Sequence, residues 1–163
     1  MWVAAIDSPA EAVWPRERNP NPYTQLRPYM LLMETVLVPV RYPLSQHSRA
    51  TLSRAIEMQD ERDGELIILH VNLYQNGRQI TRSELKRAVE REFGRLPRAR
   101  YTVRRGFLVE EGILEEIADE RADVAVIGHK QQGRLERALR RLRSDPDIAQ
   151  FLKKRVDCEI EVV

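Results

Sequence analysis

The sequence is poor in cysteine, in long apolar runs and in excess charge of either sign. Its one cysteine in 163 residues, Cys158, excludes an internal disulfide framework and a zinc site built from several cysteines. No apolar run approaches the roughly 20 residues that cross a bilayer, and the N-terminus lacks the continuous apolar stretch of a signal peptide. We therefore expect no membrane insertion and a cytoplasmic location. The 27 basic and 25 acidic residues nearly balance, so bulk charge does not indicate a nucleic-acid-binding protein.

Residues 1–32 differ in composition from the rest of the chain. They contain both tryptophans, Trp2 and Trp14, and prolines at positions 9, 15, 20, 22 and 28. We expect an irregular, proline-rich N-terminal extension over residues 1–32 and one folded domain over residues 33–163. A functional tail that docks through its aromatic residues is the alternative.

From residue 33 onward, apolar runs of strand length alternate with segments of helical periodicity. Strands are expected at residues 35–40, 65–71, 101–105, 123–127 and 158–163. The near-continuous apolar character of the second segment is typical of a parallel strand covered on both faces. The alternation predicts an α/β fold in which a doubly wound, five-stranded parallel sheet carries helices on both faces.

Local signals indicate where two of the helices begin. Thr81 and Glu84 form a capping box, and Gly94 ends the helix that this box opens. Asp145 and Pro146 have the residue types preferred at the N-cap and at the first position of a helix. We therefore expect the last helix to begin at Pro146.

A glycine-bearing turn, residues 128–133, follows the fourth predicted strand. Glycines at such a place let the backbone approach a phosphate closely, with a helix N-terminus behind it. A glycine that only turns the chain is the alternative. Because ligands of doubly wound sheets bind beyond the carboxyl ends of the strands, the candidate ligand contacts are the residues there. They are Val40, Arg41, Val71, Gly128, His129, Lys130 and Gly133.

Several segments together resemble the universal stress protein family over residues 33–163. They are Val36-Leu37-Val38-Pro39-Val40, Leu69-His70-Val71, residues 122–128 and the terminal strand, residues 158–163. The resemblance implies an adenine-nucleotide-hydrolase-like fold and a homodimer formed through the strand from Cys158 to the C-terminus. In one branch of the family it also implies ATP or AMP bound at the carboxyl end of the sheet. The other branch binds no nucleotide.

The sequence departs from the nucleotide-binding pattern of that family at three positions. Arg41 stands where an aspartate contacts the nucleoside, and Gln131 stands where the second glycine of the phosphate loop is expected. Pro146 and Asp147 align with the downstream Gly-Ser or Gly-Thr pair. A carboxylate beside a phosphate repels it unless a metal intervenes. We therefore expect the branch without nucleotide and no cofactor, and keep ATP or AMP as the alternative, with Asp147 as a further contact.

The densest basic cluster of the chain follows the glycine turn. A helix there would present these residues on one exposed face, where a protein partner with acidic groups could dock. A solvated helix face is the alternative. Aromatic residues that could stack on bases are missing from this stretch, so we expect no nucleic-acid partner. The cluster comprises Lys130, Arg134, Arg137, Arg140, Arg141 and Arg143.

The residue types available for catalysis are few. The three histidines, His47, His70 and His129, form no ligand-spaced pair, so no metal site is expected. Together with the family resemblance, which implies the dimer and the stress-response role, this leads us to expect a non-catalytic module, dimeric through residues 158–163, that acts in a stress response as a sensor or interaction domain. A protein that binds a phosphate compound is the first alternative. A slow nucleotide hydrolase that uses His129 and Asp147 is the second, and docking on a membrane partner through the basic cluster is the third.

Overall fold

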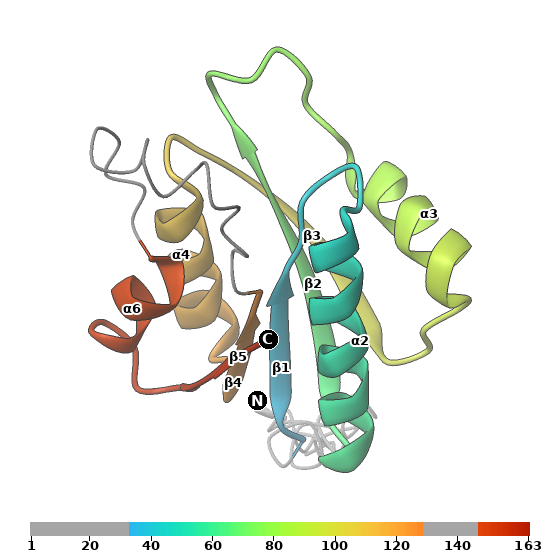
Figure 1. Cartoon of the computed structure of the whole chain (residues 1–163), viewed down its shortest axis with the longest axis vertical. Coiled ribbons are helices and arrows are strands. Elements are labelled where there is room, and N and C mark those ends of the chain that lie inside the picture. Colours follow the sequence, from blue (N-terminus) through green and yellow to red (C-terminus); the bar gives the residue numbers. More distant parts are fainter. Residues whose placement is uncertain (1–32, 129–146) are drawn as a thin grey trace, which may run out of the picture.

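A computed structural model describes residues 33–128 and 147–163, and the predicted extension over residues 1–32 lies outside this part. Strands and helices alternate along the described chain, which confirms the predicted pattern (Figure 1). None of the described helices is long and apolar enough to cross a membrane. The elements are β1 (Thr35–Pro39), α2 (Gln46–Glu61), β2 (Glu65–Leu73), α3 (Arg82–Phe93), β3 (Ala99–Gly106), α4 (Val109–Glu120), β4 (Val124–Ile127), α6 (Ile148–Lys153) and β5 (Glu159–Val162).

The strands form one parallel sheet with β1 at its centre. Its order is β3-β2-β1-β4-β5, so β3 and β5 are the two edges. Val38 of β1 is level with Ile68 of β2, and Val36 is level with Val124 of β4. Strands β2 and β3 lie on one side of β1, and β4 and β5 lie on the other. The strand order therefore reverses between β1 and β4, whose carboxyl ends border the place where doubly wound sheets bind ligands.

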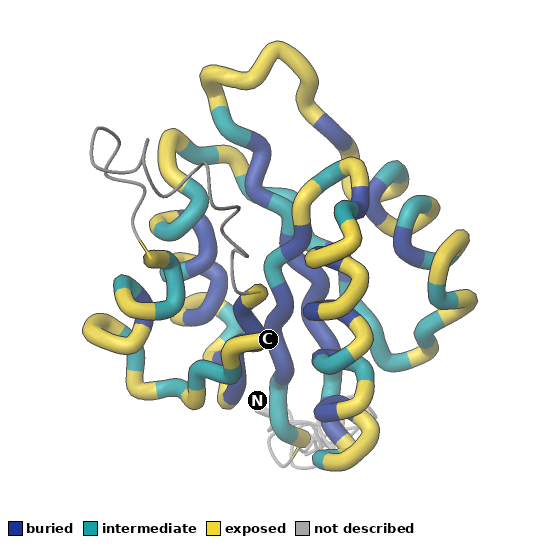
Figure 2. Tube along the Cα trace, viewed as in Figure 1, coloured by how far each residue is buried: buried dark blue, intermediate teal, exposed yellow. Residues whose placement is uncertain are grey.

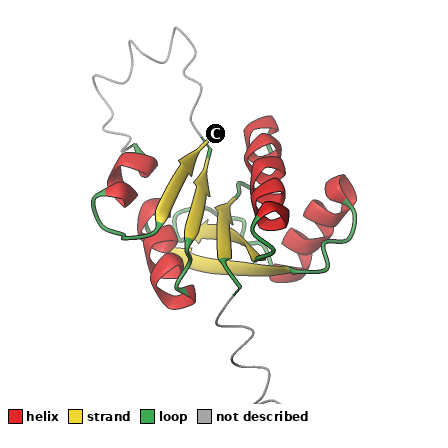
Figure 3. Ribbon diagram, turned by 90° about the horizontal axis from the view of Figure 1, so that it is seen from below, coloured by secondary structure: helices red, strands yellow, loops and turns green. Residues whose placement is uncertain are grey.

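Helices cover both faces of the sheet, as the sequence predicts (Figure 3). Helices α2 and α3 pack on one face, where Val36 and Val38 of β1 join the first apolar cluster. On the other face, Leu37 joins a second cluster to which α4 and α6 contribute. All three of these β1 side chains are fully buried, and Figure 2 shows long buried runs in the central strands, whereas the edge strands are mostly intermediate or exposed. The core is thus divided into two apolar layers by the sheet.

Helix α3 begins and ends as predicted. The Thr81 hydroxyl accepts a hydrogen bond from the amide of Glu84, whose carboxylate accepts one from the Thr81 amide in return. Gly94 follows the last turn with a φ of 74°, a value that glycine adopts without strain. Each signal depends on residues close in sequence, which is why the sequence indicates both.

Helix α6 begins later than expected. The predicted cap at Asp145 and first position at Pro146 lie outside the described residues, and the helix runs from Ile148 with Asp147 as its N-cap. The Asp147 carboxylate accepts a hydrogen bond from the Gln150 amide at 3.2 Å. Two aspartates near the start of this helix are suited to capping, and the one nearer the apolar residues takes that place.

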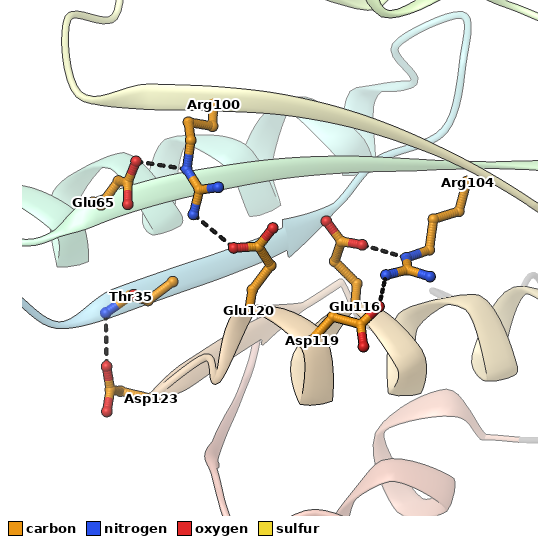
Figure 4. A network of polar contacts seen from close by, with 8 residues as sticks. All are labelled: Thr35, Glu65, Arg100, Arg104, Glu116, Asp119, Glu120 and Asp123. Carbon is orange, nitrogen blue, oxygen red and sulfur yellow. Dashed lines mark hydrogen bonds and ion pairs between the residues drawn. The ribbon is translucent and has the colours of Figure 1, made fainter. Parts of the chain in front are cut away.

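The edge strand β3 is held to α4 by ion pairs instead of apolar contacts (Figure 4). Arg100 donates to Glu65 of β2 at 2.6 Å and to Glu120 of α4 at 2.7 Å. Arg104 donates to Glu116 and Asp119 of α4. Burial lowers the pKa of Arg104, but these two hydrogen bonds outweigh it and raise the pKa above its ordinary value. Both guanidinium groups therefore stay charged and bind the acidic face of α4.

Glu116 is the most buried member of this network. It is 1% exposed, and its Oε1 atom has no hydrogen-bond partner among the described residues, so Arg104 is the group that compensates its charge. A carboxylate removed from water costs several kcal/mol unless it is paired. The burial of the Glu116 carboxylate thus depends on the guanidinium group of Arg104.

Replacing Arg104 with methionine is expected to lower the free energy of unfolding by about 3 kcal/mol, because Glu116 is left buried and uncompensated. Urea unfolding measures the change, and Arg105→Met, at an exposed position of the same strand, is the matched control. Adding Glu116→Gln to Arg104→Met is expected to restore part of the loss. Equal losses in the two methionine variants would show that the network does not hold α4.

Candidate functional site

The carboxyl ends of β1, β2 and β4 bring four of the predicted site residues to one edge of the sheet. Val40 and Arg41 follow β1, Val71 lies near the end of β2, and Gly128 follows β4. The Val40 amide donates to the carbonyl of Leu69 at 2.8 Å, which continues the pairing of β1 with β2 past the last residue of β1. This edge is the candidate site.

The loop between β1 and α2 is fixed by serines at the start of the helix. Ser45 caps α2, accepting a hydrogen bond from the Ser48 amide at 3.1 Å. The Ser48 hydroxyl in turn accepts one from the Arg41 amide at 3.2 Å, while the Arg41 side chain is exposed. A ligand at this edge would therefore meet the Arg41 guanidinium, whereas the Arg41 amide is already bound by the helix.

A stack of three side chains covers the ends of β1 and β2. The rings of Tyr42 and His70 are inclined at 69° with their centres 6.3 Å apart, and the Arg78 guanidinium lies 5.5 Å from the centre of the Tyr42 ring. The Val40 carbonyl lies 2.9 Å from His70 Nδ1, which therefore carries a proton. The stack joins residues far apart in sequence, and no local pattern indicates it.

Gly128 is explained by packing against α2. A Cβ atom at this position would lie 2.5 Å from Oγ1 of Thr51, a distance that forces a displacement. The Thr51 hydroxyl is itself committed, because it donates to the carbonyl of His47 at 2.9 Å. Glycine is thus required here whether or not a ligand binds, which supports the alternative interpretation of the turn.

Val71 and Asp147 also have structural partners. A Cβ on Gly112 of α4 would lie 2.9 Å from Cγ2 of Val71, so the valine packs tightly against that helix. Asp147 caps α6 through its carboxylate. The predicted contacts His129, Lys130 and Gly133, together with the basic cluster over residues 134–143, lie outside the described residues.

An exposed aromatic pair lies beside this edge and was not expected from the sequence. The rings of Tyr74, after β2, and Phe107, after β3, have centres 4.8 Å apart, and they are 55% and 69% exposed. Gln75 donates to the Phe107 carbonyl at 3.0 Å, and Leu108 beside it is 46% exposed. The two residues meet because β2 and β3 are neighbours.

Neither the histidines nor the cysteine forms a reactive cluster in the described chain. His47 lies in the first turn of α2, away in sequence from the stacked His70. Within residues 33–128 and 147–163, no group of three or more His, Cys, Asp or Glu side chains is arranged to hold a metal ion. Cys158 packs against the second apolar cluster, and burial raises the pKa of its thiol.

Comparison with known proteins identifies solved structures of the same fold, but no match at the level of the sequence. No family model and no curated protein matches the sequence. Universal stress protein structures match in fold. One, in complex with cAMP, has 16% identity and a TM-score of 0.55, covering 81% of this chain and 97% of its own. UspA from Lactobacillus plantarum has 14% identity and a TM-score of 0.60, with coverages of 80% and 97%.

A third match is the universal stress protein from Archaeoglobus fulgidus in complex with dAMP. It has 15% identity and a TM-score of 0.53, and the match covers 80% of this chain and 98% of that one. The chain therefore has the universal stress protein fold. The resemblance noted in the sequence is confirmed at the level of the fold, including the five parallel strands and their flanking helices.

Replacing Gly128 with alanine is expected to lower the free energy of unfolding by about 1–3 kcal/mol, the usual cost of overpacking. In a Thr51→Ala background, which removes the clashing hydroxyl, the same substitution is expected to cost clearly less. Thr51→Ser keeps the oxygen and serves as the matched control, with no relief. Equal costs of Gly128→Ala in all three backgrounds, measured by urea unfolding, would contradict the packing role of Gly128.

Proposed function

We propose that this chain is a non-catalytic interaction module of a stress response in the cytoplasm, and that it acts as a dimer through strand β5. The observation that carries the proposal is that the outer edge of β5 is unpaired in the described residues and ends in exposed apolar side chains. Within residues 33–128 and 147–163, strand β5 pairs with β4 alone, and its end bears the apolar side chains of Val162 and Val163, which are 39% and 40% exposed. A short parallel edge that ends in exposed valines is suited to a partner of the same shape.

Strand β5 is held firmly enough to present such a surface. On the α2 side, Glu159 accepts from Arg62 at 2.8 Å and Glu161 pairs with Arg54 at 3.5 Å. On the opposite side, Ile160 packs against the second apolar cluster. The backbone of β5 is thus ordered before any association, so pairing requires little further loss of conformational entropy. A second copy presents the same β5 edge, so two copies can pair edge to edge about a two-fold axis.

The carboxyl edge favours a role without nucleotide. Gly128 is required by Thr51, Asp147 is used as a helix cap, and an exposed arginine, Arg41, follows β1 where the family resemblance implies an aspartate. Each of these residues has a structural explanation or departs from the nucleotide-binding pattern. This supports an interaction module, and the absence of catalysis is part of the proposal.

A second candidate function is the binding of a phosphate compound such as ATP or AMP at the carboxyl edge. Two proteins of the same fold were crystallised with cAMP and with dAMP, which favours this candidate. The exposed Arg41 side chain and Gly128 lie at the carboxyl edge of this sheet, where the family resemblance implies the nucleotide, and an arginine can bind phosphate through two parallel hydrogen bonds.

Light scattering after size-exclusion chromatography is expected to give a mass twice the 19.1 kDa of one chain. Val162→Lys places a charge on the exposed end of β5 and is expected to yield the monomer. Leu108→Lys, at a position that is 46% exposed and far from β5 in sheet order, is the matched control and is expected to remain dimeric. A monomeric wild type, or a Val162→Lys variant that stays dimeric, would refute the proposed interface.

Millimolar ATP or AMP with magnesium is expected to leave the thermal unfolding midpoint of the full chain unchanged. A ligand present at a hundredfold excess over Kd would stabilise the native state by about 2.7 kcal/mol and raise the midpoint by about 5 °C or more. Such a rise, absent in Arg41→Ala but present in Arg105→Ala, would establish the second candidate function in place of the first.

A further inference from the structure

A hollow lies between α3 and the edge strand β3, at the opposite edge of the sheet from β5. It has a volume of about 390 Å³, and α3, the segment before β3 and β3 itself contribute to its walls. None of its residues belongs to the candidate site at the carboxyl edge. The lining residues are Arg82, Ser83, Lys86, Glu90, Arg95, Leu96, Pro97, Ala99 and Tyr101.

The lining carries a net positive charge. Three cations, from Arg82, Lys86 and Arg95, stand against the single carboxylate of Glu90. Glu90 pairs with Lys86 at 3.8 Å, and within the described residues no ion pair joins Arg82 or Arg95 to a carboxylate. An anion in the hollow would therefore meet two guanidinium groups that no described acidic side chain neutralises.

Tyr101 supplies a polar group that lacks a partner. The residue is 4% exposed, and its hydroxyl makes no hydrogen bond within the part of the chain that the structure describes. Burial, together with the nearby charge of Glu90, raises the pKa of this phenol to about 12. The hydroxyl is thus protonated at neutral pH and is a donor. The hydroxyl oxygen is itself covered by neighbouring side chains, so a bound acceptor reaches it only when these move slightly, and it would then recover the free energy that an unpaired buried donor costs.

Apart from Ser83, the remaining lining residues are apolar. Leu96, Pro97 and Ala99 line the hollow beside the basic residues, and Leu96 and Ala99 pack against the first apolar cluster. A bare inorganic ion would leave these walls uncovered, whereas a molecule with an apolar body would contact them. The hollow thus joins several charged groups to a smaller apolar wall, a combination that suits a small molecule with an anionic group and an apolar part.

We propose that the hollow between α3 and β3 binds a small molecule that carries a carboxylate or phosphate group on an apolar body. Arg82 and Arg95 bind the anionic group, Leu96 and Pro97 contact the apolar body, and the Tyr101 hydroxyl donates a hydrogen bond to the ligand. The site is independent of the β5 interface and of nucleotide binding at the carboxyl edge, so its test does not depend on the proposed function.

Phenyl phosphate and benzoate are suitable probes, because each joins one oxyanion to one apolar ring. Titrated into the ¹⁵N-labelled full chain, at least one of them is expected to give saturable amide shifts at Ser83, Lys86 and Tyr101. Benzyl alcohol, which lacks the charge, is expected to bind at least about tenfold more weakly. Response to one probe alone identifies phosphate or carboxylate as the ligand class. Absence of saturable shifts at these amides with both probes would overturn the proposal.

Substitutions separate a ligand site from a packing defect. Arg95→Gln is expected to weaken probe binding, whereas Arg91→Gln, an exposed position of α3 outside the lining, is the matched control with unchanged affinity. Tyr101→Phe is expected to weaken binding roughly 3- to 10-fold while leaving the ligand-free protein equally or more stable to urea. Unchanged affinity in both Arg95→Gln and Tyr101→Phe would overturn the assignment of this hollow.

Discussion

Strand β1 is buried on both faces and paired on both edges. The need to cover these faces and edges determines where the other elements lie. Its three central side chains are completely excluded from solvent, with Val36 and Val38 facing one apolar cluster and Leu37 the other. A strand covered in this way needs a helical layer on each side and a parallel neighbour on each edge. The sheet order places β2 and β4 there, and their carboxyl ends then border the candidate site.

The sequence predicts well those features that depend on residues close together along the chain. The apolar runs predict the strands, and the residue types of Thr81 and Glu84, which form reciprocal hydrogen bonds, predict the start of α3. Both signals involve only residues that are close together in the sequence. The alternation of the elements then restricts the topology to a doubly wound sheet. The start of α6 was predicted wrongly because the neighbouring Asp147 is an equally good cap.

Features that depend on contacts between distant segments are not predicted by the sequence. Gly128, after β4, is the residue expected in a phosphate loop. Only the position of Thr51 on α2 shows that packing requires a glycine there. The stack of Tyr42, His70 and Arg78 and the hollow beneath α3 likewise combine residues from separate elements. For the candidate site, the sequence indicates the correct edge of the sheet, while the roles of individual residues follow from the fold.

The charge distribution of α4 has a consequence for how the domain assembles. This helix has acidic side chains at six positions, from Glu110 to Glu120, and no basic residue of its own. Like charges four residues apart destabilise an isolated helix, and β3 supplies two arginines that pair with four of these six side chains. We therefore expect helix α4 to be weak by itself and to be stabilised when β3 pairs with it, so that the helix and the strand form together.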